Sequence, residues 1–251
     1  ISTAFLRYLL SSFSFVINAV REFILGGSKT IVAFSSWDFI KENPWAVWPA
    51  LPWTVVVGWA MVLGYKLQGR NLAFLTGVAG LYIAAFGQWS PSMQTLSFIL
   101  IAAPVSVFLG LALGVFAYKS KAVEAFLNPL LNVAQTMPHY SYLVPIIVLF
   151  GVGDHAAALV TILFATPSMV RLVLLGLKNV PTDVVDAGRM SGCNDFQMLF
   201  RVLIPTAKRD VLIGVNQVVM QCLSMTVIAA FIGAQGLGSN LLIALNSLRI
   251  G

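Results

Sequence analysis

Polar side chains inside two apolar stretches are the first candidates for chemistry in this sequence. The stretch at 127–150 contains two prolines, and a proline in a helix frees backbone carbonyls that neighbours or a water-lined path must satisfy. Its candidate residues are Gln135, Thr136, Pro138, His139, Tyr140 and Tyr142. The stretch at 211–232 has Gln217, Gln221 and Ser224 at helical spacing on one face, with Asn216 beside them.

These groups favour either a polar path through a helix bundle or hydrogen bonds between helices, and the sequence leaves both interpretations open. Catalysis is not indicated, because His139, His155 and scattered serines provide no paired nucleophile and base and no metal cluster. The sequence also has no Gly-x-x-x-x-Gly-Lys-Ser/Thr motif. We therefore expect no catalytic residue, no metal and no cofactor in this chain.

The composition indicates that a membrane surrounds the elements that position these residues. Of the 251 residues, 59% are apolar and 10% are charged, against roughly 25% charged in an ordinary soluble domain. Charge is absent from 71–118 and 211–248, and such runs exceed the roughly 20 apolar residues that cross a bilayer. The sequence thus predicts an all-α, polytopic membrane protein with spans at 50–65, 72–88, 94–118, 127–150, 155–177 and 211–232, and a shorter apolar piece at 237–248.

The basic residues give these spans a direction. Lys and Arg gather at 66–71, 119–126 and 178–210, and cytoplasmic loops of membrane proteins are enriched in these residues. We therefore attribute the net charge of +6 to basic residues in cytoplasmic loops, and we expect no nucleic acid partner. Residues 1–44 are predicted to form an amphipathic segment that lies in the membrane interface.

The only long polar connection between spans, at 178–210, is a candidate docking element. Pro181 begins one expected helix and Gly192 ends it, while Asn194 and Gln197 form the capping box of a second helix that closes before Pro205. The loop has apolar side chains that need a cover. Either it packs on its own bundle or it docks on a cytoplasmic partner.

The spacing of Asp186-Ala187-Gly188, then Gly192, then Val202, Ile204 and Pro205 resembles the EAA signature of permease subunits of ATP-binding-cassette (ABC) importers. Asp replaces Glu and Gly188 replaces the second Ala of that signature, while the spacing is kept. The resemblance implies a coupling helix that docks on an ATPase. The residues expected to take part are Asp186, Ala187, Gly188, Gly192, Phe196, Leu199 and Pro205.

Further motifs resemble one branch of these permeases, the importers of glycine betaine, proline betaine and choline. They include Gln135-Thr136-Met137-Pro138, Leu149-Phe150-Gly151-Val152-Gly153 and Gly214-Val215-Asn216-Gln217. The resemblance covers roughly 94–248. It implies a type I ABC importer transmembrane domain whose permease core at 93–251 stops before a last span. The apolar runs before this core predict N-terminal transmembrane helices at 45–92.

The resemblance also implies a function and partners. The chain would pass a small quaternary or methylated amine (glycine betaine, proline betaine, choline or trimethylamine N-oxide) across the bacterial cytoplasmic membrane after delivery by an external binding protein. The expected partners are cytoplasmic ABC ATPase subunits that hold ATP and Mg, a second permease copy and the lipid bilayer.

Two alternatives remain from the residues alone, an ABC permease for another solute such as an amino acid and an ion-coupled secondary transporter. All nine acidic residues lie outside the expected spans, which disfavours proton coupling and leaves sodium coupling open.

Overall fold

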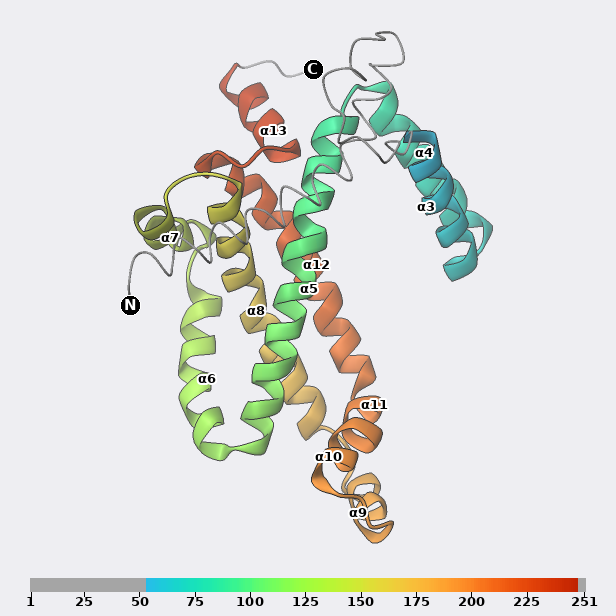
Figure 1. Cartoon of the computed structure of the whole chain (residues 1–251), viewed down its shortest axis with the longest axis vertical. Helices are drawn as coiled ribbons and strands as arrows, with labels where there is room; N and C mark the ends of the chain where they lie inside the picture. Colours follow the sequence, from blue (N-terminus) through green and yellow to red (C-terminus); the bar gives the residue numbers. More distant parts are fainter. Residues whose placement is uncertain (1–52, 248–251) are drawn as a thin grey trace, which may run out of the picture. The chain divides into compact units, whose positions relative to one another are not determined.

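The computed structural model describes residues 53–247, and every regular element in that range is a helix (Figure 1). The predicted all-α class is confirmed. The chain divides into two compact units, one made of 53–98 with 233–247 and the other of 99–232. The predicted amphipathic segment at 1–44 lies outside the described residues.

A helical hairpin makes up most of the first unit. Helices α3 (Trp53–Gln68) and α4 (Arg70–Ala85) reverse direction at Gly69, whose φ of 84° suits glycine. A Cβ at Gly80 would lie 2.6 Å from Val57 Cγ2, so this glycine lets the two backbones approach closely.

The two spans expected at 50–65 and 72–88 correspond to α3 and α4. Both helices have 16 residues, fewer than the roughly 20 that cross a bilayer. Gly69 and Gly87 bound α4, because their positive φ values of 84° and 66° bring the backbone out of helical geometry on each side of it.

The first unit also contains the start of α5 (Trp89–Lys119) and the short helix α13 (Leu237–Asn246). The Leu237 amide donates a hydrogen bond to Thr95 Oγ1 at 3.0 Å, and Asn240 Nδ2 donates one to Gln88 Oε1 at 3.0 Å. A Cβ at Gly236 would lie 2.6 Å from Thr95 Oγ1. Polar contacts and a glycine therefore hold the beginning of α13 against the beginning of α5.

Helix α8 (Asp154–Lys178) is the core of the second unit. Within the described part of the chain, three helices are long and apolar enough to span a membrane, or four if a bent pair of helices counts as one span. The three are Trp89–Lys119, Ala156–Lys178 and Lys208–Ile232, and their apolar windows are 33%, 61% and 22% buried. The third of these comprises α12 (Lys208–Ala229) and η3 (Ala230–Ile232). Glycines bring α5 and α12 onto α8, since Gly110 and Gly214 both face Met169, at 2.4 Å from its Cβ and 2.7 Å from its Sδ respectively for an added Cβ.

The apolar stretch at 127–150, which contains two prolines, is broken. It consists of α6 (Lys121–Thr136), η1 (His139–Tyr142) and α7 (Leu143–Phe150), with a bend of 115° between α6 and the rest. Met137 is extended, with ψ of 135°, because it precedes Pro138 and the proline ring disfavours helical geometry there. The helix begins six residues earlier than expected, where Ser120 accepts a hydrogen bond from the Val123 amide.

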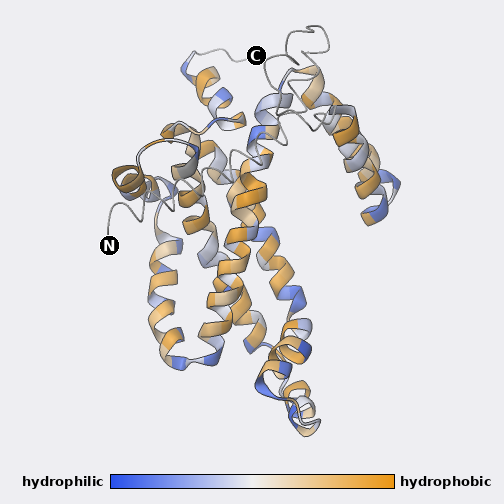
Figure 2. Ribbon diagram, viewed as in Figure 1, coloured by the Kyte–Doolittle hydropathy of each residue, from blue (hydrophilic) through white to orange (hydrophobic). Residues whose placement is uncertain are grey.

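Four short elements connect α8 to α12. They are α9 (Thr182–Met190), α10 (Asp195–Gln197), the π-helix η2 (Met198–Leu203) and α11 (Ile204–Thr206). Hydrophilic residues gather on these elements and at the α5–α6 turn, whereas α5, α6 and α8 are mostly apolar along their length (Figure 2). At the opposite end of the same unit, the Gly153 amide donates to Ile232 O at 2.8 Å. The predicted grouping of 119–126 with 178–210 at one end thus agrees with the structure.

Candidate functional site

Gly192 ends the first helix of the loop at 178–210 in the predicted way. Its φ is 74°, its amide donates to Arg189 O at 3.0 Å, and the Cys193 amide donates to Gly188 O at 3.2 Å. This pair of bonds is a Schellman motif, which satisfies the last carbonyls of a helix. The prediction of two helices joined at a glycine is confirmed.

The second helix begins as predicted and ends differently. Asn194 and Gln197 form the capping box, with the Asn194 amide donating to Gln197 Oε1 at 3.1 Å. The helix does not close before Pro205, because the π-helix η2 carries the chain into α11, and Pro205 lies in the first turn of α11. The wider π turn accommodates a residue that cannot donate the usual helical hydrogen bond.

Two of the predicted docking residues are buried within the described chain, and their role in docking stays a prediction. Leu199 is 4% exposed and lies in the interior of the loop with Met198 and Leu203. Gly188 is also buried, and a Cβ there would lie 2.8 Å from Met198 Cε. At Gly188 the backbone of α9 therefore lies directly against the side chain of Met198 in η2.

The outer face of the loop combines polar and apolar residues without a cover among the described residues. Asp186, Ala187 and Pro205 are exposed, and Phe196 is 66% exposed with its ring centroid 4.5 Å from that of Phe200. Met190, at the end of α9, is 85% exposed and was not singled out from the sequence. Its position at the end of α9 gave no periodic signal.

At the break in the second unit, Tyr142 compensates for Pro138. A proline cannot donate to the carbonyl four residues earlier, and here that carbonyl belongs to Ala134. The Tyr142 hydroxyl donates to Ala134 O at 2.5 Å. The break therefore leaves this carbonyl satisfied, as expected for backbone in an apolar medium.

Aromatic rings surround the break. The His139 ring centroid lies 4.3 Å from that of Phe164 on α8, and the Tyr142 ring lies 5.7 Å from the same phenyl ring. Tyr140 contacts Phe231 of η3 edge-on at 5.8 Å. Neither phenylalanine was singled out from the sequence, because each lies in an apolar run far from 139–142.

The remaining candidates near the break are on exposed surface. Gln135, Thr136 and Pro138 are exposed. The Thr136 hydroxyl donates within its own helix, to Asn132 O and Val133 O at 3.1 Å each. Gln135 is thus the exposed amide beside the break, and its role in a path stays a prediction.

The polar stripe on α12 divides into two kinds of residue. Gln221 Nε2 donates to Ser168 Oγ of α8 at 2.8 Å, while the Ser224 hydroxyl donates to Met220 O of its own helix at 3.0 Å. Asn216 and Gln217 are exposed. Gln221 therefore links two helices of this chain, whereas Asn216 and Gln217 present amides at the surface of the unit.

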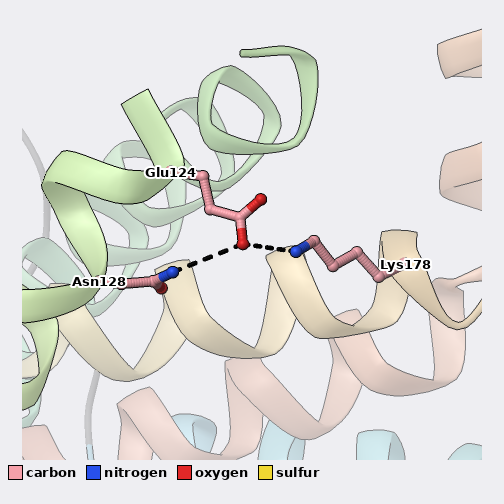
Figure 3. Close-up of polar contacts among 3 residues, drawn as sticks. All are labelled: Glu124, Asn128 and Lys178. Atoms are coloured by element: carbon pink, nitrogen blue, oxygen red, sulfur yellow. Dashed lines mark hydrogen bonds and ion pairs between the residues drawn. The ribbon is translucent and has the colours of Figure 1, made fainter. Parts of the chain in front are cut away.

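A set of polar residues that the sequence did not indicate joins α6 to α8 at the hydrophilic end of the second unit. Lys178 Nζ and Asn128 Nδ2 both donate to Glu124 Oε1, at 2.5 and 3.4 Å (Figure 3). Arg171 Nη2 donates to Asn132 Oδ1. We call these five residues the polar seam.

Within residues 53–247 no cluster of three or more His, Cys, Asp or Glu side chains is arranged to hold a metal ion. The geometry described is that of a helical membrane component with a structured polar loop at one end.

The model of a known family, "Binding-protein-dependent transport system inner membrane component", matches residues 106–251. The chain belongs to this family. The predictions of a transport permease and of a multi-pass inner-membrane location are confirmed by this membership.

Among proteins of similar sequence, the trimethylamine N-oxide transport system permease protein TmoV of Pelagibacter ubique is 61% identical over 98% of this chain and 34% of that protein. The glycine betaine/proline betaine transport system permease protein ProW of Escherichia coli is 38% identical over 85% of this chain and 60% of that protein. The chain spans only about a third of the length of TmoV.

The fold is also similar to that of a solved structure. An inward-facing MetNI methionine ABC transporter matches 68% of this chain and 82% of the solved chain, with a TM-score of 0.57 and 22% identity. This likeness confirms the predicted fold of a type I ABC importer transmembrane subunit.

Proposed function

We propose that this chain is the membrane-embedded part of an ATP-driven importer that passes a small methylated amine across the cytoplasmic membrane. The observation that carries the proposal is the 61% identity to TmoV over 98% of the chain. The 38% identity to ProW supports the same chemical class, since both relatives are described as transporting small methylated amines. Trimethylamine N-oxide is therefore the first substrate to test and glycine betaine the second.

The distribution of charge fits a zwitterionic substrate. Neither 125–153 nor 211–248 contains an acidic residue, so the candidate path at the break and on α12 has no carboxylate to hold a cation tightly. Amide, hydroxyl and aromatic groups are present instead, and aromatic faces attract methylated ammonium groups. Such groups let a weakly held zwitterion pass.

The proposed partners follow from the loop and the family. The exposed face around Phe196 and Phe200 would dock on a cytoplasmic ATPase, which holds ATP and Mg. An external binding protein would deliver the amine, and a second permease copy would complete the pore against exposed surfaces such as that of Asn216 and Gln217.

The test is uptake into proteoliposomes that contain the assembled complex, its binding protein and internal ATP. Labelled trimethylamine N-oxide, glycine betaine and choline are compared with histidine and maltose. We expect ATP-dependent accumulation of at least one methylated amine and of neither control. Accumulation of histidine or maltose alone would overturn the substrate class while leaving the importer family intact.

A further inference from the structure

Helix α6 is lightly anchored by apolar packing. Of its 16 residues only Leu131 is buried, and Phe126, Leu130 and Val133 are exposed. Elements with few buried apolar contacts open and move most easily. The polar seam therefore contributes much of what holds α6 against α8.

The seam follows one line along each helix. Glu124, Asn128 and Asn132 are spaced four residues apart and so lie on one face of α6. Arg171 and Lys178 are seven residues apart on α8, two turns that bring both to the same face. Two links at different heights, Lys178 to Glu124 and Arg171 to Asn132, fix the rotation of α6 as well as its distance.

The position of the seam in the chain connects two functional regions. Lys178 is the last residue of α8 and the first residue of the loop at 178–210. Helix α9 begins four residues later, at Thr182. Asn132 lies near the end of α6, five residues before the break at 137–138. A movement at the base of the loop thus reaches the break through one pair of helices.

We propose that the polar seam makes α6 move together with the cytoplasmic end of α8, so that Lys178, Glu124, Arg171 and Asn132 are positioning residues that transmit loop movement to the break at 137–138. This inference rests on the proposed function, because transmission has meaning only in a coupled transporter. The seam acts as a rigid link and stays closed through the transport cycle.

The first test separates transmission from simple stability. Glu124→Gln and Lys178→Met each remove one charge of the ion pair, and we expect amine uptake per ATP hydrolysed to fall by about fivefold or more, the low end of typical coupling between sites. The double swap Glu124→Lys with Lys178→Glu restores the pair and should recover most of the ratio. Lys119→Met, which removes an exposed cation from the same end of the unit, is the matched control and should leave the ratio unchanged.

A second test does not depend on the substrate. Glu124→Cys with Lys178→Cys, in a background where Cys193 and Cys222 are Ser, is joined with a short bifunctional thiol reagent, and partner-stimulated ATPase activity is measured. A rigid link predicts that the joined protein keeps its activity. Loss of activity on joining, or single variants with an unchanged uptake ratio, would overturn the proposal. Absence of amine uptake in the unmodified complex would instead count against the proposed function. The ATPase measurement would still test whether the polar seam is a rigid link.

Discussion

Single residues determine where the backbone of the second unit changes direction. Gly192 has a positive φ that residues with a Cβ rarely adopt. Pro138 has no backbone N–H, so it cannot donate a hydrogen bond to Ala134 O. Tyr142 then supplies that donor from outside the helix. At both positions one residue type is matched to one backbone requirement.

Replacing Gly192 tests the Schellman motif. An added Cβ has no atom within 4 Å, so Gly192→Val should act through backbone strain alone, at about 1–2 kcal/mol for the left-handed conformation. We expect reduced partner-stimulated ATPase activity in the assembled complex. Gly192→Asn, which tolerates this conformation better, is the control, and full activity in Gly192→Val would contradict the assigned role of the turn.

Replacing Tyr142 tests the compensation at the break. Tyr142→Phe leaves Ala134 O without its donor and should lower stability by about 1–3 kcal/mol, read as a lower melting temperature in detergent. Tyr140→Phe, whose hydroxyl donates to no atom of the described residues, should have little effect. In a Pro138→Ala background the loss from Tyr142→Phe should shrink, because residue 138 regains an N–H. Equal losses in both backgrounds would disprove the pairing of Pro138 with Tyr142.

At the scale of elements, helix contacts depend on glycines that face α8. Gly110 and Gly114 on α5 approach Met169 and Val173 so closely that an added Cβ would lie 2.4 and 2.7 Å from the nearest side-chain atoms. Those atoms are Cβ atoms close to the backbone of α8, which cannot move aside as the end of a flexible side chain can. The interface between α5 and α8 is therefore intolerant of larger residues.

The prediction for this interface is a difference between two glycines. Gly110→Ala should destabilise the protein by about 1–3 kcal/mol through overpacking, measured as a lower melting temperature. Gly58→Ala, in α3 with no atom within 4 Å of the added Cβ, should leave the melting temperature close to that of the unmodified protein. The same loss in both variants would show that close packing at Gly110 is not the cause.

The sequence predicted those features of the fold that depend on the residues at the same position in the chain. Pro138 marked the break, and Gly192 with Asn194 marked the turn and the cap, because each acts on its own backbone. The π-helix at 198–203 and the burial of Leu199 depend on how η2 packs against α9. The ion pair of Glu124 with Lys178 joins residues 54 positions apart, which no spacing rule along one helix can reveal.

At the scale of the whole molecule, the charged ends and apolar helices define a direction across the membrane. Residues 119–126 and 178–210 lie at one end of the second unit, joined by the ion pair of Glu124 with Lys178. The positive-inside rule places this end in the cytoplasm, where an ATPase could reach the exposed face of the loop.

Cysteine labelling tests that direction. In a background with Cys193→Ser and Cys222→Ser, an impermeant thiol reagent applied to sealed cells should label Ser90→Cys and not Thr182→Cys, although both positions are exposed. Opening the membrane should make Thr182→Cys reactive. Labelling of Thr182→Cys in sealed cells would reverse the assignment.

The energy source for amine uptake distinguishes an ATP-driven importer from an ion-coupled transporter. The assembled complex is reconstituted in vesicles with its binding protein and labelled trimethylamine N-oxide outside, and uptake is followed with internal ATP or with an imposed sodium or proton gradient. The proposed permease should accumulate the amine when ATP is present inside the vesicles, and neither gradient should drive uptake without ATP. Accumulation driven by either gradient in the absence of ATP would contradict the proposed function and favour an ion-coupled transporter.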